Sequence, residues 1–112
     1  MDIELDELIR RRADVVVLDV RSDGEYTGAT GYPCDPRQGH IPGARHVELS
    51  QLFDRTREEI QELVGRPPGA EVVTYCHSGS RSALAAELLR AAGYEARNYT
   101  GSWHEWSRQL ES

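Results

Sequence analysis

Short apolar runs alternate with amphipathic segments along this chain of 112 residues. Residues 15–20 and 71–75 are nearly continuous aliphatic and β-branched stretches, which predicts strands buried on both faces of a sheet. Residues 5–12 and 82–92 repeat apolar side chains at helical spacing, and a glycine follows the second of them as a stop signal. In that second helix the apolar face is expected to carry Leu84, Ala85, Leu88, Leu89 and Ala92.

The rest of the chain continues this alternation. Glycine and proline residues make 27–38 a predicted loop, followed by a short strand at 45–49 and a short helix at 50–53 capped by Ser50. Thr56 and Glu59 form a capping box for a helix ending at residue 64. A strand at 96–99 and a helix from about Trp103 complete the pattern. It predicts an α/β fold with a mainly parallel central sheet and helices on both faces, in one domain spanning residues 1–112.

Residues 76–82, Cys-His-Ser-Gly-Ser-Arg-Ser, join the strand at 71–75 to the helix after it. Cys76 therefore lies at a strand-to-helix turn, and Gly79 allows the backbone to curl there. Such a turn directs backbone N–H groups and a helix N-terminus at one point, which stabilises an anion. Because the thiolate is the nucleophilic form of cysteine, Cys76 is predicted to be a nucleophile with a lowered pKa. The alternative is a small buried residue ending a strand, and it leaves the glycine and arginine unexplained.

Four segments in order give the chain a family resemblance. Residues 76–82 resemble the active-site loop of the rhodanese (sulfurtransferase) family, and residues 16–26 resemble its Asp-x-Arg signature on the first strand. Residues 39–44, Gly-His-Ile-Pro-Gly-Ala, match a further signature of that family. Residues 98–106 are similar to the closing segment of the catalytic halves of two-domain thiosulfate and mercaptopyruvate sulfurtransferases. The resemblance runs from about Val15 to about Leu110 and implies a rhodanese-like domain.

This resemblance implies a thiosulfate sulfurtransferase (rhodanese)-type enzyme without a cofactor. Cys76 would take a sulfane sulfur from a donor such as thiosulfate, hold it as a persulfide, and yield it to cyanide or a thiol. Arg81 is expected to face the anionic end of the donor or the persulfide, since a cation in the first turn of a helix is otherwise unfavourable. The other substrate-binding candidates are His77, Ser78, Gly79 and Ser80.

Each of these loop residues also has a structural interpretation. Gly79 serves the backbone, and Ser78 and Ser80 either donate to substrate or cap the helix. His77 is either a general acid or, as we favour, an exposed loop residue. Ser82 is interpreted as the helix cap or as a residue that lines the loop.

Supporting residues are expected outside the loop. Asp19 and Arg21 are predicted to form an ion pair that braces the end of the first strand against the active loop. Glu25 and Ser78 depart from the two-domain thiosulfate enzymes, which tend to carry arginine and lysine there, and this weakens the case for thiosulfate as donor. Arg37 could replace the missing anion clamp, since arginine binds such groups bidentately.

Several other residues could have a functional role, but a structural role is favoured for each. His40 is interpreted as a hydrogen-bonding turn residue, and Trp103 and Trp106 as packing residues. Cys34 is either an ordinary loop thiol or a resolving cysteine that accepts sulfur from Cys76. No set of histidines and cysteines has the spacing of a zinc site, so no metal is predicted.

Two rival classes remain. Phosphatases require Cys-x5-Arg, whereas this loop is Cys-x4-Arg and has Ser82 where the phosphatase arginine would stand. A persulfide carrier or regulatory rhodanese module serving a protein partner fits the same residues as an enzyme does. The net charge of −6 argues against nucleic-acid binding. No long apolar segment indicates a membrane, and a working thiol suggests the reduced cytoplasm. The partners expected are a small anionic sulfur donor, a thiol or cyanide acceptor, and a sulfur-accepting protein as a further option.

Overall fold

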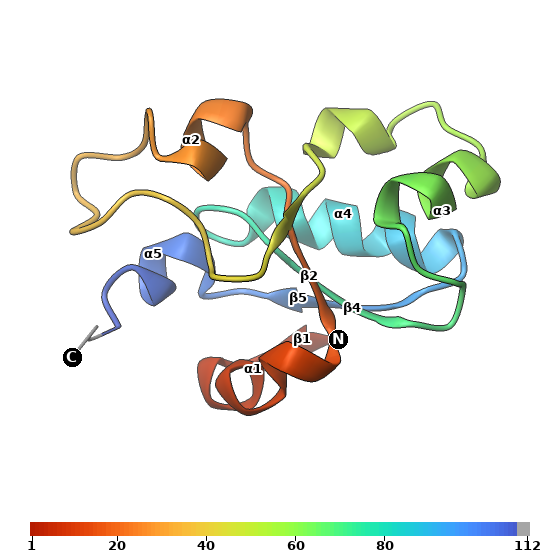
Figure 1. The fold of residues 1–112 in the computed structure, drawn as a ribbon, viewed down its shortest axis with the longest axis horizontal. Coiled ribbons are helices and arrows are strands. Elements are labelled where there is room, and N and C mark those ends of the chain that lie inside the picture. The colour runs from red at the N-terminus through yellow and green to blue at the C-terminus, as the bar shows by residue number, and fades with distance from the viewer. Residues whose placement is uncertain (110–112) are drawn as a thin grey trace.

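The computed structural model describes residues 1–109, which fold around one parallel sheet (Figure 1). The strand order is β1-β5-β4-β2-β3, and every neighbouring pair is parallel. The predicted α/β fold with a parallel sheet is therefore confirmed. The strands are β1 (Asp2–Ile3), β2 (Val16–Asp19), β3 (Arg45–His46), β4 (Glu71–Tyr75) and β5 (Glu95–Tyr99).

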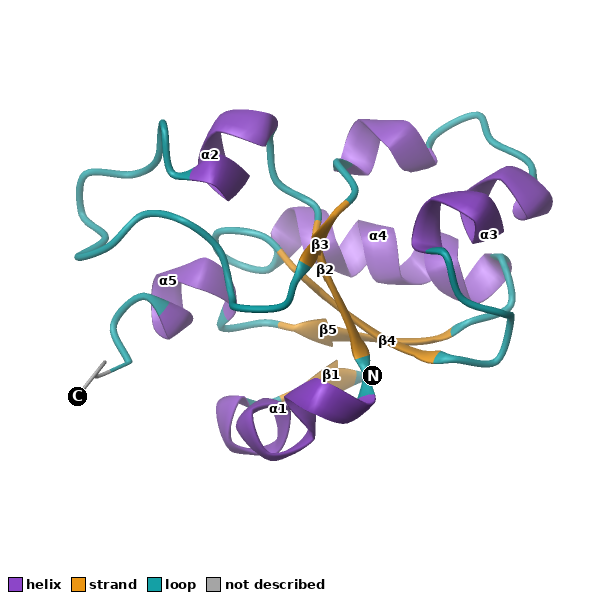
Figure 2. Ribbon diagram, in the orientation of Figure 1, coloured by secondary structure: helices purple, strands orange, loops and turns teal. Residues whose placement is uncertain are grey.

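Helices cover both faces of this sheet, as Figure 2 shows. On one face lie α3 (Arg57–Val64) and α4 (Ser80–Ala91), and the other carries α1 (Leu5–Arg11) and α5 (Ser102–Trp106). Because side chains alternate along a strand, Val72 packs into the first layer and Val73 into the second. The near-continuous apolar strands of the sequence are thus explained by burial on both sides.

Side-chain caps define several element boundaries. The predicted capping box at Thr56 and Glu59 is present at the start of α3, and Gly65 ends that helix in the left-handed conformation. A second capping box, Ser22 with Glu25, starts the short helix α2 (Asp23–Thr27), which the sequence analysis left unassigned. This helix is important because it brings Glu25 to Arg81.

The structure corrects four expectations about elements. The helix predicted at 50–53 is a 3-10 turn at Leu49–Leu52 capped by Glu48, so Ser50 lies inside it. α4 begins at Ser80 rather than Ser82. Leu84 is exposed on α4, where the buried residues are Ser82, Ala85, Ala86 and Leu89. β1 was not foreseen, because two residues carry no periodic signal.

The end of the family resemblance near Leu110 lies outside the described residues. Within the described part of the chain, none of the helices combines the length and hydropathy needed to cross a membrane.

Candidate active site

Cys76 lies directly after β4, at the carboxyl edge of the sheet, and α4 begins four residues later. The side chain is almost completely buried, with only 1% of the residue exposed. Ligands of open parallel sheets bind at this edge, where strand ends and helix N-termini converge. The predicted strand–loop–helix placement of the thiol is confirmed.

Several groups of the loop donate hydrogen bonds to the sulfur of Cys76. The backbone N–H of Gly79 donates to Sγ of Cys76 over 3.1 Å, and the Ser82 hydroxyl donates to it over 3.4 Å. Burial alone would raise the pKa of this thiol. The hydroxyl of Ser82 and the backbone amides of Ser82, Gly79 and Ser78 outweigh burial and lower that pKa. The thiolate form of Cys76 is therefore favoured more at neutral pH than that of an ordinary cysteine.

Gly79 makes this loop possible. Its φ of +100° lies in the left-handed region, and a Cβ there would stand 2.8 Å from the backbone oxygen of Thr100. Gly79 also serves as N-cap of α4, without a side-chain cap, so the capping roles considered for Ser78, Ser80 and Ser82 are wrong. Ser82 lies inside the first turn instead, where its hydroxyl reaches the thiol.

The loop is held from beneath by the segment after β5. The Ser102 hydroxyl accepts the Cys76 backbone N–H at 3.1 Å, and the Trp103 N–H donates to the Cys76 carbonyl at 2.9 Å. The Asn98 side-chain amide donates to the Gly79 carbonyl at 3.1 Å. Sequence reasoning assigned no role to Asn98 and Ser102, because their contacts to the loop arise only when β5 and α5 pack beside it.

Arg81 was expected to face an anionic donor, yet its guanidinium binds the Glu25 carboxylate. The two terminal nitrogens donate to the two carboxylate oxygens at 3.0 and 3.1 Å. Burial would raise the pKa of Glu25, but hydrogen bonds from Arg81 and Ser22 lower it to about 2. The pair is therefore ionised at neutral pH, and its two charges cancel beside the loop.

Asp19 and Arg21 form the predicted ion pair, and both are fully buried. Nη2 of Arg21 donates to Asp19 Oδ2 at 2.7 Å, and the same oxygen accepts the Tyr75 hydroxyl at 2.7 Å. Tyr75 is the residue before Cys76, so this network braces the ends of β2 and β4 together. The guanidinium also lies 5.2 Å from the centre of the Trp103 ring.

His77 is not the exposed loop residue that we favoured. Only 12% of its side chain is exposed, its ring stacks on Tyr32 with centroids 3.7 Å apart, and its Nε2 lies 2.9 Å from Oδ2 of Asp35. Cys34 and His104 lie in the same group, so four potential metal ligands meet beside the loop that follows Cys76. The sequence spacing concealed this group because its members come from three separate segments.

The other candidates have structural surroundings. The Arg37 guanidinium donates to carbonyl oxygens of Trp106, Ser107 and Gln109 at the end of α5, so it does not serve as an anion clamp in this structure. His40 bonds the Tyr26 carbonyl at 2.8 Å, in agreement with its predicted turn role. Trp103 and Trp106 are core residues, as expected. Ser80 is exposed at the helix start.

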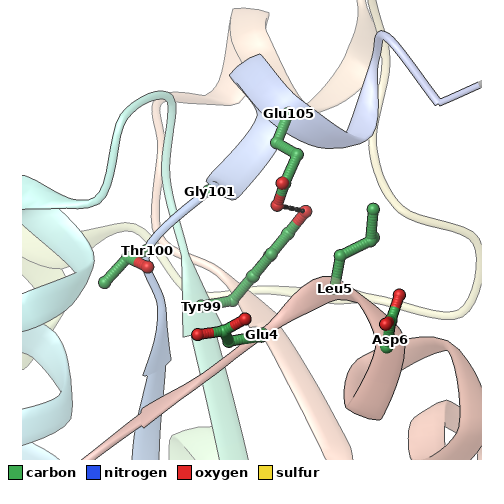
Figure 3. Close-up of a pocket in the computed structure, with 7 residues that line it drawn as sticks. All are labelled: Glu4, Leu5, Asp6, Tyr99, Thr100, Gly101 and Glu105. Atoms are coloured by element: carbon green, nitrogen blue, oxygen red, sulfur yellow. Dashed lines mark hydrogen bonds between the residues drawn. The ribbon is translucent and has the colours of Figure 1, made fainter.

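Two hollows adjoin these elements. One, of about 270 Å³, is lined in part by Glu4, Asp6 and Glu105 and by none of residues 76–82 (Figure 3). Its carboxylates disfavour an anionic sulfur donor. The other, of about 290 Å³, is lined by Glu25 and Tyr32, which contact Arg81 and His77 of the loop. Neither hollow is lined by a residue of 76–82, but the second adjoins the loop through the contacts of Glu25 and Tyr32.

Fold and site together define a class: an α/β protein with a buried cysteine, whose thiol pKa is lowered, in the tight connection between a parallel strand and the helix that follows it. The chain belongs to the rhodanese family. The family model of the Rhodanese-like domain matches residues 3–109, which is nearly the whole chain.

Named relatives agree with this membership. The chain is 37% identical to a thiosulfate sulfurtransferase of Azotobacter vinelandii, covering 89% of this chain and 40% of that protein. A crystal structure of a probable thiosulfate sulfurtransferase superposes with a TM-score of 0.86 at 44% identity, covering 96% of this chain and 45% of that one. The human single-domain sulfurtransferase TSTD1 gives a TM-score of 0.73 at 30% identity, covering 98% and 97%. The chain thus spans about two fifths of the curated relative and nearly all of the human domain.

Proposed function

We propose that this chain is a sulfurtransferase that carries a sulfane sulfur as a persulfide on Cys76. The thiolate attacks the outer sulfur of a donor such as thiosulfate. The donor's S–S bond breaks, and its electron pair leaves with sulfite. A thiol or cyanide then attacks the outer sulfur of the persulfide and regenerates the Cys76 thiolate.

The observation that carries this proposal is the set of donors around Sγ of Cys76. The Gly79 amide and the Ser82 hydroxyl already point at the sulfur, and a persulfide places its negative charge one atom further into the same loop. No change of protonation is needed in the loop as sulfur arrives or leaves. The loop's Cys-x4-Arg length suits a sulfur atom and is one residue shorter than the phosphatase loop.

The Glu25–Arg81 pair bears on the donor. A free arginine would attract thiosulfate, whereas this arginine already has both terminal nitrogens on a carboxylate. If a dianion binds Arg81, the bonds between Arg81 and Glu25 must break, and their loss weakens the binding. A less charged persulfide donor does not require these bonds to break. We therefore propose that the preferred donor carries less negative charge than thiosulfate.

A second candidate function is a persulfide carrier that serves a protein partner. The observation that favours it is a hollow of about 290 Å³ beside the loop, lined by Ser22, Glu25, Thr30, Gly31 and Tyr32, where a partner could approach the residues that contact Arg81 and His77. The proposal includes a single domain working in a reducing compartment such as the cytoplasm, because Cys76 must stay a free thiol.

Intact mass after incubation with thiosulfate, and separately with 3-mercaptopyruvate or glutathione persulfide, tests the function. The wild type is expected to gain one sulfur, and Cys76→Ser is expected to gain none, because a hydroxyl is too weakly acidic to replace the thiolate. Cys34→Ser is the matched control and should load normally. Sulfur on Cys76→Ser, or thiocyanate formation by it in the presence of cyanide, would refute the assignment. Turnover with cyanide distinguishes an enzyme from a carrier that loads once and releases slowly.

A further inference from the structure

Four side chains with metal-ligating atoms meet at the rim of the active-site loop. Cys34 and Asp35 come from the loop before β3, His77 follows Cys76, and His104 lies on α5. One ligand atom from each lies within 4.8 Å of the others. This group is separate from the thiol that performs the proposed sulfur transfer.

The spacing of these atoms is close to that of a tetrahedral zinc site. Oxygens of Asp35 lie 2.9 Å from His77 Nε2, 3.5 Å from His104 Nδ1 and 3.9 Å from Cys34 Sγ. Zn–N and Zn–O bonds of about 2.1 Å with a Zn–S bond of about 2.3 Å place tetrahedral ligands roughly 3.4–3.7 Å apart. Rotations of exposed side chains would bring the set to that geometry.

The surroundings support two of the ligands in place. Tyr32 stacks on the His77 ring, and the Asp35 side chain is fully buried. Cys34 and His104 are exposed at the rim of the group.

A cation already uses this group. The Arg108 guanidinium donates to Asp35 Oδ1 at 2.9 Å, approaches Nδ1 of His104 at 3.2 Å and donates to the Cys34 carbonyl at 2.8 Å. It reaches in from the end of the described chain with 37% of its side chain exposed, so it can leave into solvent. The position therefore attracts positive charge, and a metal ion would compete with Arg108 for it.

We propose that Cys34, Asp35, His77 and His104 form a binding site for a divalent transition metal, with Zn²⁺ as the ion that this donor set suits best. One thiolate, two imidazoles and one carboxylate are the ligands that zinc prefers. On binding, the Cys34 thiol releases its proton to solvent and Arg108 moves away. The ion would tie three segments together across the rim of the Cys76 loop.

Cobalt absorption tests the proposal, because a thiolate–Co²⁺ charge-transfer band reports sulfur ligation directly. All variants carry Cys76→Ser, so that the catalytic thiol cannot ligate. Reduced, metal-free Cys76→Ser protein is expected to develop the band with saturation at one equivalent, and Zn²⁺ should abolish it by displacement. Adding Cys34→Ser should abolish the band, and adding His104→Asn should weaken binding by about tenfold or more.

Arg108→Ala provides the sign test. Removing the competing cation should tighten Co²⁺ binding several-fold, whereas a merely structural arginine would leave it unchanged or weaker. Circular dichroism confirms that each variant is folded. Failure of Cys76→Ser protein to bind Co²⁺ below millimolar concentration, or a band that survives Cys34→Ser, would overturn the proposal. The sulfur-loading assay uses no metal, so its outcome is independent of this one.

Discussion

At the scale of single residues, Ser82 is the side chain that bonds the Cys76 thiol and lowers its pKa. Its buried hydroxyl points at Sγ of Cys76 and lowers the thiol pKa. Ser82→Ala should therefore raise this pKa and slow alkylation by iodoacetamide at neutral pH by up to roughly tenfold, as expected for the loss of a hydrogen bond to a charged group. The pH–rate profile should move to higher pH. Ser80→Ala, in the same helical turn but exposed, is the control, and equal profiles for the two variants would contradict the assignment.

Glu25 decides what Arg81 can bind. Glu25→Gln removes the negative charge that holds the guanidinium, so kcat/KM for thiosulfate should rise, by roughly tenfold if one charge-assisted bond to the donor is gained. Asp23→Asn removes the same charge from the exposed side of α2 and should change little. Arg81→Ala should lower kcat/KM for thiosulfate. A fall in Glu25→Gln as well would show that the pair serves to shape the loop.

At the scale of elements, the junction between β4 and α4 depends on the backbone of Gly79. Gly79→Ala meets an unfavourable positive φ and a contact of 2.8 Å with the Thr100 oxygen, whereas Gly69→Ala at a similar φ of +93° meets no atom within 4 Å. Both substitutions should cost about 1–2 kcal/mol for the backbone conformation. Gly79→Ala should cost at least about 1 kcal/mol more for the clash and should lose sulfur transfer. Urea unfolding measures both variants, and equal free energies of unfolding would contradict this account.

At the scale of the whole molecule, Tyr75 connects three distant segments. Its hydroxyl donates to Asp19 on β2 and accepts the N–H of Ile41 at 3.0 Å in the turn before β3. Burial and the Asp19 charge raise the pKa of Tyr75, so the hydroxyl stays a donor. Tyr75→Phe takes away the acceptor of the Ile41 N–H and one of the donors to Asp19, whose carboxylate keeps its bonds to Arg21, and should cost about 1–3 kcal/mol of unfolding free energy. Tyr94→Phe, which loses one bond to a carbonyl, should cost less; the reverse order would show that the network is not a brace.

The sequence alone determined the architecture and the position of Cys76 in it. Buried strands carry apolar side chains on both faces, so the alternation of strands and helices could be predicted from local sequence patterns. Capping residues mark helix starts, so the capping box at Thr56 could be predicted in the same way. The position of Cys76 at a strand-to-helix turn could be predicted too, because the strand, the glycine and the helix are consecutive in the chain.

Only the tertiary structure decided which residues act together around that thiol. Glu25 neutralises Arg81 across 56 positions, and His77 meets Asp35 across 42. Ser82 reaches the thiol rather than capping, because α4 begins two residues earlier than periodicity indicates. Ion pairs and clusters of potential ligands depend on distances in space. Where irregular loops join the segments, these distances cannot be predicted from spacing along the chain.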